Sequence, residues 1–296
     1  MKSDQLDTGK TQLYGDVGLD EQFKTGMGVI GLNYFKSFNS KTYLRVTLSS
    51  SLERQENIQH KFGLKRDTTT DEFAIEDGKY IIDTLFQKLG YNLDQAKHSA
   101  SFFVNKKLNN RHTVKVGIIT DLYQQVNMID SIYNETDSIW VNRLDHKGFM
   151  SLLQPYVQWK YKITDELTLN TGIHGQFLMS NGSTSIEPRA GLRWRVTPSQ
   201  ALSLGVGMHS QMLPTYIYFA GLQNKDGSYD QYNKELGFLR STHYVLAYDN
   251  SLNNSLRIRI ETYYQQLSNI PVEVKSSSYS VLNAGAELNR FFPERL

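Results

Sequence analysis

The sequence predicts an all-β fold: an antiparallel transmembrane β-barrel fragment of about ten strands, with short periplasmic turns and long extracellular loops. Three observations lead to this prediction. Apolar and polar residues alternate with a period of two along much of the chain. Short turns alternate with long polar segments, as in bacterial outer-membrane barrels. Aromatic residues, 12% of the 296 residues, gather near the ends of the expected strands on their apolar faces.

The clearest alternation runs from residue 256 to residue 265. One face would carry Leu256, Ile258, Ile260, Thr262 and Tyr264. The other face would carry Arg257, Arg259, Glu261, Tyr263 and Gln265. A helix would mix the two sets, whereas a strand separates them completely.

The same pattern recurs in other segments, which we expect to form further strands. It is clear in residues 156–161, 167–177, 189–196, 202–209 and 243–249, and weaker in 28–38, 43–52, 98–107 and 114–122. Many expected strands have about ten residues or more. This length exceeds the soluble mode of about 5–6 residues and is close to what a tilted strand needs to cross a bilayer.

The connections between these segments alternate in length. Short turns are expected at residues 39–40, 109–111, 164–166, 197–199 and 252–254, most of which contain Asn or Pro, residues that favour tight bends. Longer polar segments are expected to form outer loops at residues 53–94, 129–147, 180–187 and 213–241. From the residues alone, a soluble β-sandwich with its charged face in water remains the alternative.

Several function classes find no support in the composition and motifs. The chain has no cysteine, which excludes thiolate metal sites, thiol catalysis and disulfides. The net charge of +2 gives no global argument for nucleic acid as a partner. Gly205 and Gly207 lie inside an expected strand, so they do not form a phosphate loop. We therefore expect no enzyme, no cofactor and no dedicated metal site.

The candidate ligand-contacting residues are polar side chains on the inward face of the expected barrel. They are His174, His209, His243, Arg189, Arg193, Arg257, Arg259 and Glu261. The three histidines lie at similar distances from their nearest short turns. Imidazoles in a lumen could contact a metal ion or a haem. Alternatively, they could donate hydrogen bonds to lumen water or to a domain that fills the lumen.

Residues 185–214, which read SIEPRAGLRWRVTPSQALSLGVGMHSQMLP, carry a family resemblance. A strand that opens with a Pro-Arg pair leads through a short turn into a strand that ends in Gly-x-His-Ser-Gln. This segment resembles the mid-barrel region of TonB-dependent receptors of Bacteroidetes-type bacteria. The resemblance continues in residues 241–274 and 279–296.

The resemblance implies a barrel of about 22 strands in the outer membrane of a Gram-negative bacterium. Such receptors take up a scarce ligand, such as a siderophore, a vitamin or an oligosaccharide, with energy from the TonB complex acting on a plug domain. The implied partners are the TonB complex, outer-membrane lipid and an unknown small ligand. A passive porin or a structural outer-membrane barrel is the alternative.

The resemblance also implies how the chain is divided. Residues 1–25 would be a strand or loop remnant, and residues 26–296 would be part of the receptor barrel. A plug and its TonB-binding segment are expected before Met1, and further strands after Leu296. This division fits the lack of a secretory signal peptide at the start of the sequence.

Overall fold

A computed structural model describes residues 5–7, 19–224, 226–253, 255–276 and 280–282. Most of residues 1–25 and of residues 279–296 lie outside the described residues. The boundary expected between residues 25 and 26 falls inside a strand, Leu19–Asn39.

The described chain is built almost entirely from antiparallel strands. Ten of them form one sheet in the order β14-β13-β10-β9-β8-β7-β6-β5-β3-β2. Their bounds are β2 Leu19–Asn39, β3 Thr42–Leu64, β5 Lys79–Lys107, β6 His112–Asn134, β7 Ile139–Lys162, β8 Leu167–Leu178, β9 Ser183–Arg195, β10 Gln200–Gln211, β13 Leu239–Ser251 and β14 Arg257–Ser268. The predicted all-β antiparallel fold is confirmed.

The remaining elements are short. Strands β1 (Gln5–Asp7) and β4 (Ile75–Glu76) pair with β5. Strands β11 (Gly221–Gln223) and β12 (Tyr229–Gln231) form a hairpin, and α1 (Thr215–Phe219) precedes it. Among the described residues, no helix is long and apolar enough to span a bilayer.

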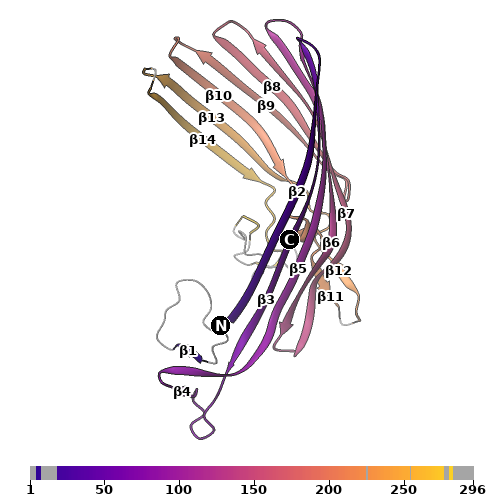
Figure 1. The fold of residues 1–296 in the computed structure, drawn as a ribbon, viewed down its shortest axis with the longest axis vertical. Coiled ribbons are helices and arrows are strands. Elements are labelled where there is room, and N and C mark those ends of the chain that lie inside the picture. Colours follow the sequence, from indigo (N-terminus) through magenta and orange to yellow (C-terminus); the bar gives the residue numbers. More distant parts are fainter. Residues whose placement is uncertain (1–4, 8–18, 225, 254, 277–279, 283–296) are drawn as a thin grey trace.

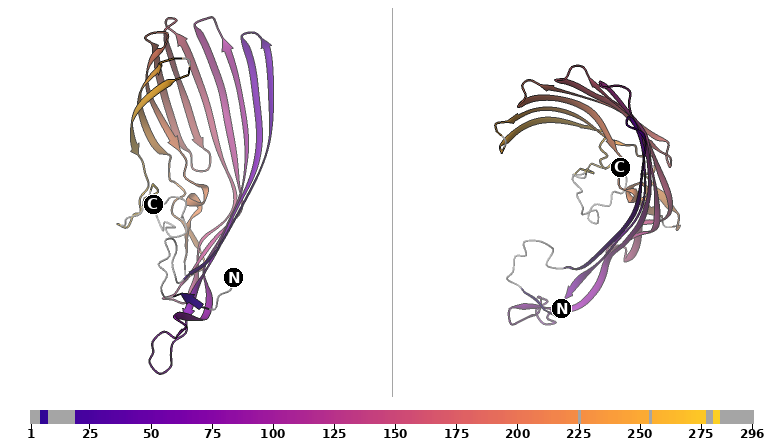
Figure 2. Two further views of the ribbon diagram at one scale, coloured as in Figure 1. Left: turned by 60° about the vertical axis from the view of Figure 1, so that its left-hand side comes forward. Right: turned by 45° about the horizontal axis from the view of Figure 1, so that its top comes forward.

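The main sheet is a curved wall with two free edges, β2 and β14 (Figures 1 and 2). The five short turns lie together at one end of the wall, at the top of Figure 1. We call this the short-turn end. The other end carries the connections 65–78, 135–138, 179–182 and 212–238.

The two faces of the wall differ in chemistry, as the alternation predicts. On one face, the register aligns Trp194, Leu202, Tyr248 and Ile260 in one row across β9, β10, β13 and β14. Each of the other strands of the wall also exposes apolar side chains on this face, including Ile30, Leu48, Phe102, Val116, Val157 and Ile173. We call this the outer face. The opposite, inner face carries the charged side chains.

The strands are longer than the sequence pattern indicates. Residues 53–94 were expected to form an outer loop, but β3 extends to Leu64 and β5 begins at Lys79. The loops expected at 129–147 and 180–187 are reduced in the same way to the connections 135–138 and 179–182. The backbone ladder continues there through segments rich in polar residues, where apolar alternation is limited to short runs such as Leu89, Tyr91 and Leu93.

The predicted loop at 213–241 is present, but it packs against the wall. Within the connection 212–238, Leu213, Ile217, Tyr218 and Phe238 are buried. They join one apolar cluster with wall residues from β6, β7 and β8, namely Met128, Leu144, Met150, Leu152 and Leu178. The Tyr218 hydroxyl accepts a hydrogen bond from the backbone N–H of Leu213 at 3.1 Å, and burial raises the pKa of this hydroxyl.

The connection 212–238 covers the inner face. Its first residues, Met212 to Thr215, line the same cavity as Lys97, Asp121 and Glu187, which are inner-face residues of β5, β6 and β9. The Phe219 ring also stacks on His146 of β7, with ring centroids 3.6 Å apart. The lumen side of the wall is therefore partly filled by the chain's own connection.

Candidate functional site

Two groups of connected polar side chains on the inner face contain residues predicted from the sequence. The first, which we call the Glu187 cluster, consists of His174, Gln176, Glu187, Arg189 and Ser210. The second, the Asp249 cluster, consists of Arg193, Asp249 and Arg257. Between them, the two clusters contain four of the eight candidate residues predicted from the sequence, namely His174, Arg189, Arg193 and Arg257.

The Glu187 cluster lies where two strands separate. The ladder between β9 and β10 ends at the pair Arg189 and Gly207. The next residue of β9 is Pro188, which has no N–H to give to a ladder. Beyond it, the Glu187 carboxylate accepts the backbone N–H of Ser210 at 3.0 Å. Side chains thus take over the hydrogen bonds that the backbone of β9 no longer makes.

Glu187 is 1% exposed, and its two oxygens accept several further hydrogen bonds. Oε1 accepts bonds from the Ser210 hydroxyl and the Gln176 amide. Oε2 lies 3.0 Å from Nδ1 of His174 and also accepts a bond from the Arg189 guanidinium. A buried carboxylate needs this degree of compensation to offset its lost hydration.

The three predicted histidines are only partly brought together. The rings of His209 and His243 meet edge to face, with centroids 4.9 Å apart. His174 is instead bonded to Glu187. Within the described ranges, no three His, Asp or Glu side chains lie where they could jointly hold a metal ion. The geometry therefore gives no support to a metal contact shared by the three histidines.

The predicted arginines each lie beside a carboxylate. In the Asp249 cluster, Arg257 donates two hydrogen bonds to Asp249, and Nη2 of Arg193 lies 3.8 Å from an Asp249 oxygen. Arg259 is paired with Glu261 on β14 at 2.7 Å. These ion pairs brace the inner face near the short-turn end.

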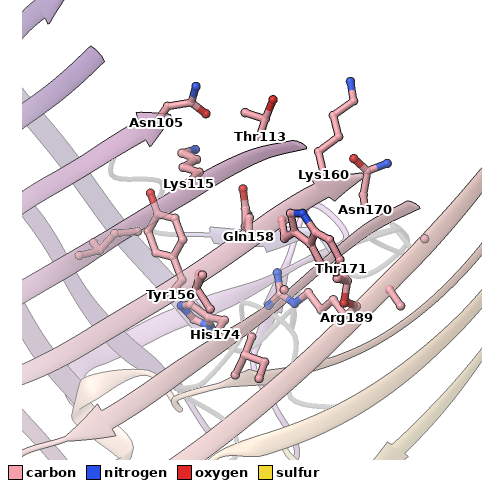
Figure 3. A pocket seen from close by; sticks show the side chains of 17 residues that line it. Asn105, Thr113, Lys115, Tyr156, Gln158, Lys160, Asn170, Thr171, His174 and Arg189 are labelled. Carbon is pink, nitrogen blue, oxygen red and sulfur yellow. The ribbon is translucent and has the colours of Figure 1, made fainter. Parts of the chain in front are cut away.

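A pocket of about 740 Å³ lies on the inner face beside these clusters, nearer the short-turn end. We call it the Lys115 pocket. Its polar lining residues are Asn105, Thr113, Lys115, Tyr156, Gln158, Lys160, Asn170, Thr171, His174 and Arg189. Figure 3 shows Asn105, Thr113, Gln158 and Lys160 pointing to the same side of the sheet. No Asp or Glu is among the lining residues that the structure describes.

Comparison with solved structures places this wall among known barrels. The copper transporter OprC is similar with a TM-score of 0.53 and 12% identity, over 84% of this chain and 39% of that chain. The RagAB peptide transporter has a TM-score of 0.50 and 11% identity, over 83% and 30% of the two chains. The chain has the fold of a TonB-dependent receptor barrel.

Other comparisons add less. The ferric-catecholate import receptor Fiu of E. coli K12 has a TM-score of 0.49 and 12% identity, over 84% of this chain and 37% of that chain. The chain thus spans between 30% and 39% of the length of these three structures of TonB-dependent receptors. No family model matches the sequence, and no curated protein matches it.

Sequence reasoning missed the carboxylates that organise the inner face of this receptor-type barrel. Glu187 and Asp249 have the same inward parity as the predicted Arg and His residues of their strands. That parity was the available signal. Sequence reasoning also missed Lys115 and Lys160, because their position beside a shared pocket depends on the register of β6 and β7.

Proposed function

We propose that this chain forms part of the barrel wall of an outer-membrane receptor that takes up a scarce ligand. The TonB complex would supply the energy through a plug domain. The observation that carries the proposal is that the two faces of one wall differ in the chemistry of their side chains. The outer face exposes apolar side chains along the strands, while the inner face carries charged, hydrogen-bonded clusters.

The outer face supports a position in the outer membrane of a Gram-negative bacterium. Bilayer hydrocarbon is the environment that such a face fits, because the strands satisfy one another's backbone groups within the sheet. Aromatic residues such as Trp159 and Trp194 lie a few residues from the short turns, where the membrane interface would be. In bacterial barrels the short turns face the periplasm, so we expect the same orientation here.

The charged inner face supports a transport role. Three of its carboxylates, those of Glu187, Asp249 and Glu261, are bonded to arginines, and that of Asp121 lies 3.3 Å from the Lys97 ammonium. The structures that share the fold include a copper transporter and a peptide transporter. The ligand of this chain belongs to the same broad class of scarce nutrients, such as a siderophore, a vitamin or an oligosaccharide.

Conductance separates this proposal from its alternative, a passive porin. The full-length protein that contains this chain would be reconstituted in planar bilayers in KCl. A receptor closed by a plug is expected to give no steady conductance. Stable open channels would instead identify a passive pore. In cells, a photo-crosslink between the full-length protein and the C-terminal domain of TonB is the second expected result.

A further inference from the structure

We propose that the Lys115 pocket binds an anionic group, a phosphate or a carboxylate, of a small ligand. This inference rests on the proposed function, because it assigns a ligand chemistry to the receptor. It also places a binding site at the short-turn end of the inner face. That end is opposite the connections 65–78 and 212–238, where an incoming ligand would first meet the protein.

The pocket presents hydrogen-bond donors and two lysines to one space. Lys115 lies on β6 between Asn105 and Gln158, and Lys160 lies on β7 between Thr113 and Asn170. Among the described residues, neither lysine has a carboxylate oxygen within 4.0 Å of its Nζ. The amide and hydroxyl neighbours can donate hydrogen bonds to the same acceptor. This combination suits an anion.

The third cation of the lining is different. The Arg189 guanidinium is bonded to Glu187, and its Nε donates to the carbonyl of Met208 at 3.2 Å. Its charge is therefore already balanced within the wall. Lys115 and Lys160 are the cations of the pocket that the described chain leaves for a ligand.

The ammonium of Lys115 is held in place before any ligand arrives. Its Nζ lies 4.2 Å from the centroid of the Phe103 ring and 5.6 Å from that of Tyr156. Aromatic faces attract a cation without neutralising its charge. The group is thus oriented and partly shielded from water, while its charge stays available to an anion.

Gly117 makes this arrangement sterically possible. A Cβ at this position would lie 2.6 Å from the Tyr156 ring and 2.7 Å from the Phe103 Cβ. Only a glycine lets both side chains lie beside Lys115. The absence of a side chain at position 117 therefore belongs to the architecture of the pocket.

The surroundings raise the local positive potential. Residues 105–115 and 189–200 contain basic residues and no acidic ones. Apart from Arg189 and Arg193, which lie beside Glu187 and Asp249, the basic residues of these segments and of the neighbouring end of β7 are Lys106, Lys107, Arg111, Lys115, Lys160, Lys162 and Arg195. Asp165 and Glu166 are the acidic residues of the intervening turn. Such a patch raises the local concentration of anions.

The test is a binding titration with the full-length protein in detergent micelles at low ionic strength. Inorganic phosphate and citrate are the two anionic probes, and sucrose is the neutral probe. Isothermal titration calorimetry would give the dissociation constants. We expect both anions to bind and sucrose not to bind. The variant Lys115→Gln/Lys160→Gln should weaken anion binding at least tenfold, and Lys115→Arg/Lys160→Arg should keep it within about threefold.

The matched control is Lys79→Gln/Lys234→Gln, which removes the same charge from exposed positions far from the pocket. Heat-modifiable migration on a gel would verify that every variant folds. Absence of anion binding to the wild-type protein would overturn the proposal. So would unchanged binding in the pocket variant, or equal weakening in the control variant, which would indicate non-specific attraction.

These outcomes are separable from those of the proposed function. Failure of anion binding in a protein that conducts no ions and crosslinks to TonB would overturn the pocket and leave the receptor proposal standing. Anion binding in a protein that forms open channels would support the pocket and contradict energy-coupled uptake.

Discussion

At Glu187, a single side chain replaces part of a β-ladder. The strand cannot continue its pairing past Pro188, and the freed backbone N–H of Ser210 needs an acceptor. A carboxylate supplies it, and its charge is then compensated by Arg189 and by neutral donors. Desolvating an ion costs several kcal/mol, so the arrangement holds only if these bonds are all made.

Replacement of this carboxylate by an amide should therefore be costly. Glu187→Gln places an NH₂ group against donors from Ser210, Gln176 or Arg189. We expect the free energy of unfolding to fall by about 2–4 kcal/mol, measured by urea denaturation of the full-length protein in lipid vesicles. Glu261→Gln is the control, because the Arg259–Glu261 pair is exposed and should contribute less than about 1 kcal/mol. Equal losses in the two variants would contradict this account.

The residues of the candidate site were predictable only in part. Parity alone identified the inward His and Arg side chains, because alternate residues of a strand share a face. Contacts such as Arg193 with Asp249 need the register of three strands, which a single sequence does not contain. The meeting of Lys115 and Lys160 at one pocket depends on register in the same way.

Among the elements, the connection 212–238 is the one that most changes the inner face. Its short helix α1 is entirely buried, although the segment was expected to form an outer loop. Apolar residues such as Ile217 and Phe219 explain the difference, because they bury surface against Met150 and Leu178 of the wall. The wall supplies apolar partners on an otherwise polar face.

A charge in this cluster should release the connection. Ile217 is 1% exposed, so Ile217→Asp would place an unpaired carboxylate among apolar side chains. We expect limited proteolysis to cleave within 212–238 at least tenfold faster than in the wild type. The barrel should still migrate in its heat-modifiable form, because the main ladders are untouched. Glu235→Ala, an exposed position of the same connection, should cleave at the wild-type rate. Unchanged cleavage in Ile217→Asp would show that the docking of α1 does not protect the segment.

The connection 135–138 is held by a charge that depends on pH. The Lys61 ammonium lies 2.8 Å from Glu135, Lys88 lies at 3.8 Å, and the bond from Lys61 lowers the pKa of Glu135 below its ordinary value of 4.5. A carboxyl whose pKa is depressed on folding stabilises above the unfolded pKa and loses this effect as the pH falls through the folded pKa. The tie should therefore be intact at neutral pH and weaken in acid below the ordinary value.

A spin label can follow this tie, because the chain has no native cysteine. A nitroxide attached to Thr136→Cys should become more mobile as the pH falls through this range, as measured by electron paramagnetic resonance. In Glu135→Gln, the mobility should be high at all pH values and independent of pH. A label that responds equally to pH in both proteins would refute the role of Glu135.

Sequence pattern identified the elements where the outer face is apolar and failed where it is not. The alternation in residues 202–209 and 256–265 corresponds to β10 and β14. Within residues 53–94, Leu89, Tyr91 and Leu93 of β5 do alternate with polar residues and glycine, but the rest of the segment is dominated by polar residues, so the pattern is short and was not recognised as a strand. Alternation of apolar and polar residues indicates that one face of a strand contacts an apolar environment. The backbone hydrogen bonds between strands do not by themselves require such a pattern in the sequence.

At the scale of the whole molecule, the two faces of the wall should differ in how well they tolerate a charged substitution. The outer face exposes side chains such as Phe102, which is 45% exposed. Its neighbour on β5, Ser101, lies on the inner face. The two positions have nearly the same depth in the wall. They therefore test which face contacts lipid.

Phe102→Arg should destabilise the inserted barrel by about 2–4 kcal/mol, as a cation at the bilayer midplane does. Ser101→Arg should be tolerated, because its charge reaches a wet lumen. The folded fraction of each full-length variant, measured by heat-modifiable migration after refolding into vesicles, checks both. Equal folding of both variants, or a greater loss for Ser101→Arg, would contradict the assignment of the faces.

The unequal heights of the strands affect how a solute reaches the lumen. Strand β3 has 23 residues and β10 has 12. At about 3.3 Å per residue, the wall at β3 is taller by about 35 Å along the strand. At the end away from the short turns, the rim of the described wall is therefore oblique: it is high at the long strands β2 to β7 and low at the short strands β8 to β14 (Figure 1). A solute that diffuses over the ends of the short strands meets the inner face of the long strands beyond them. Along this part of the rim, the entrance to the lumen is therefore open toward the side of β8 to β14.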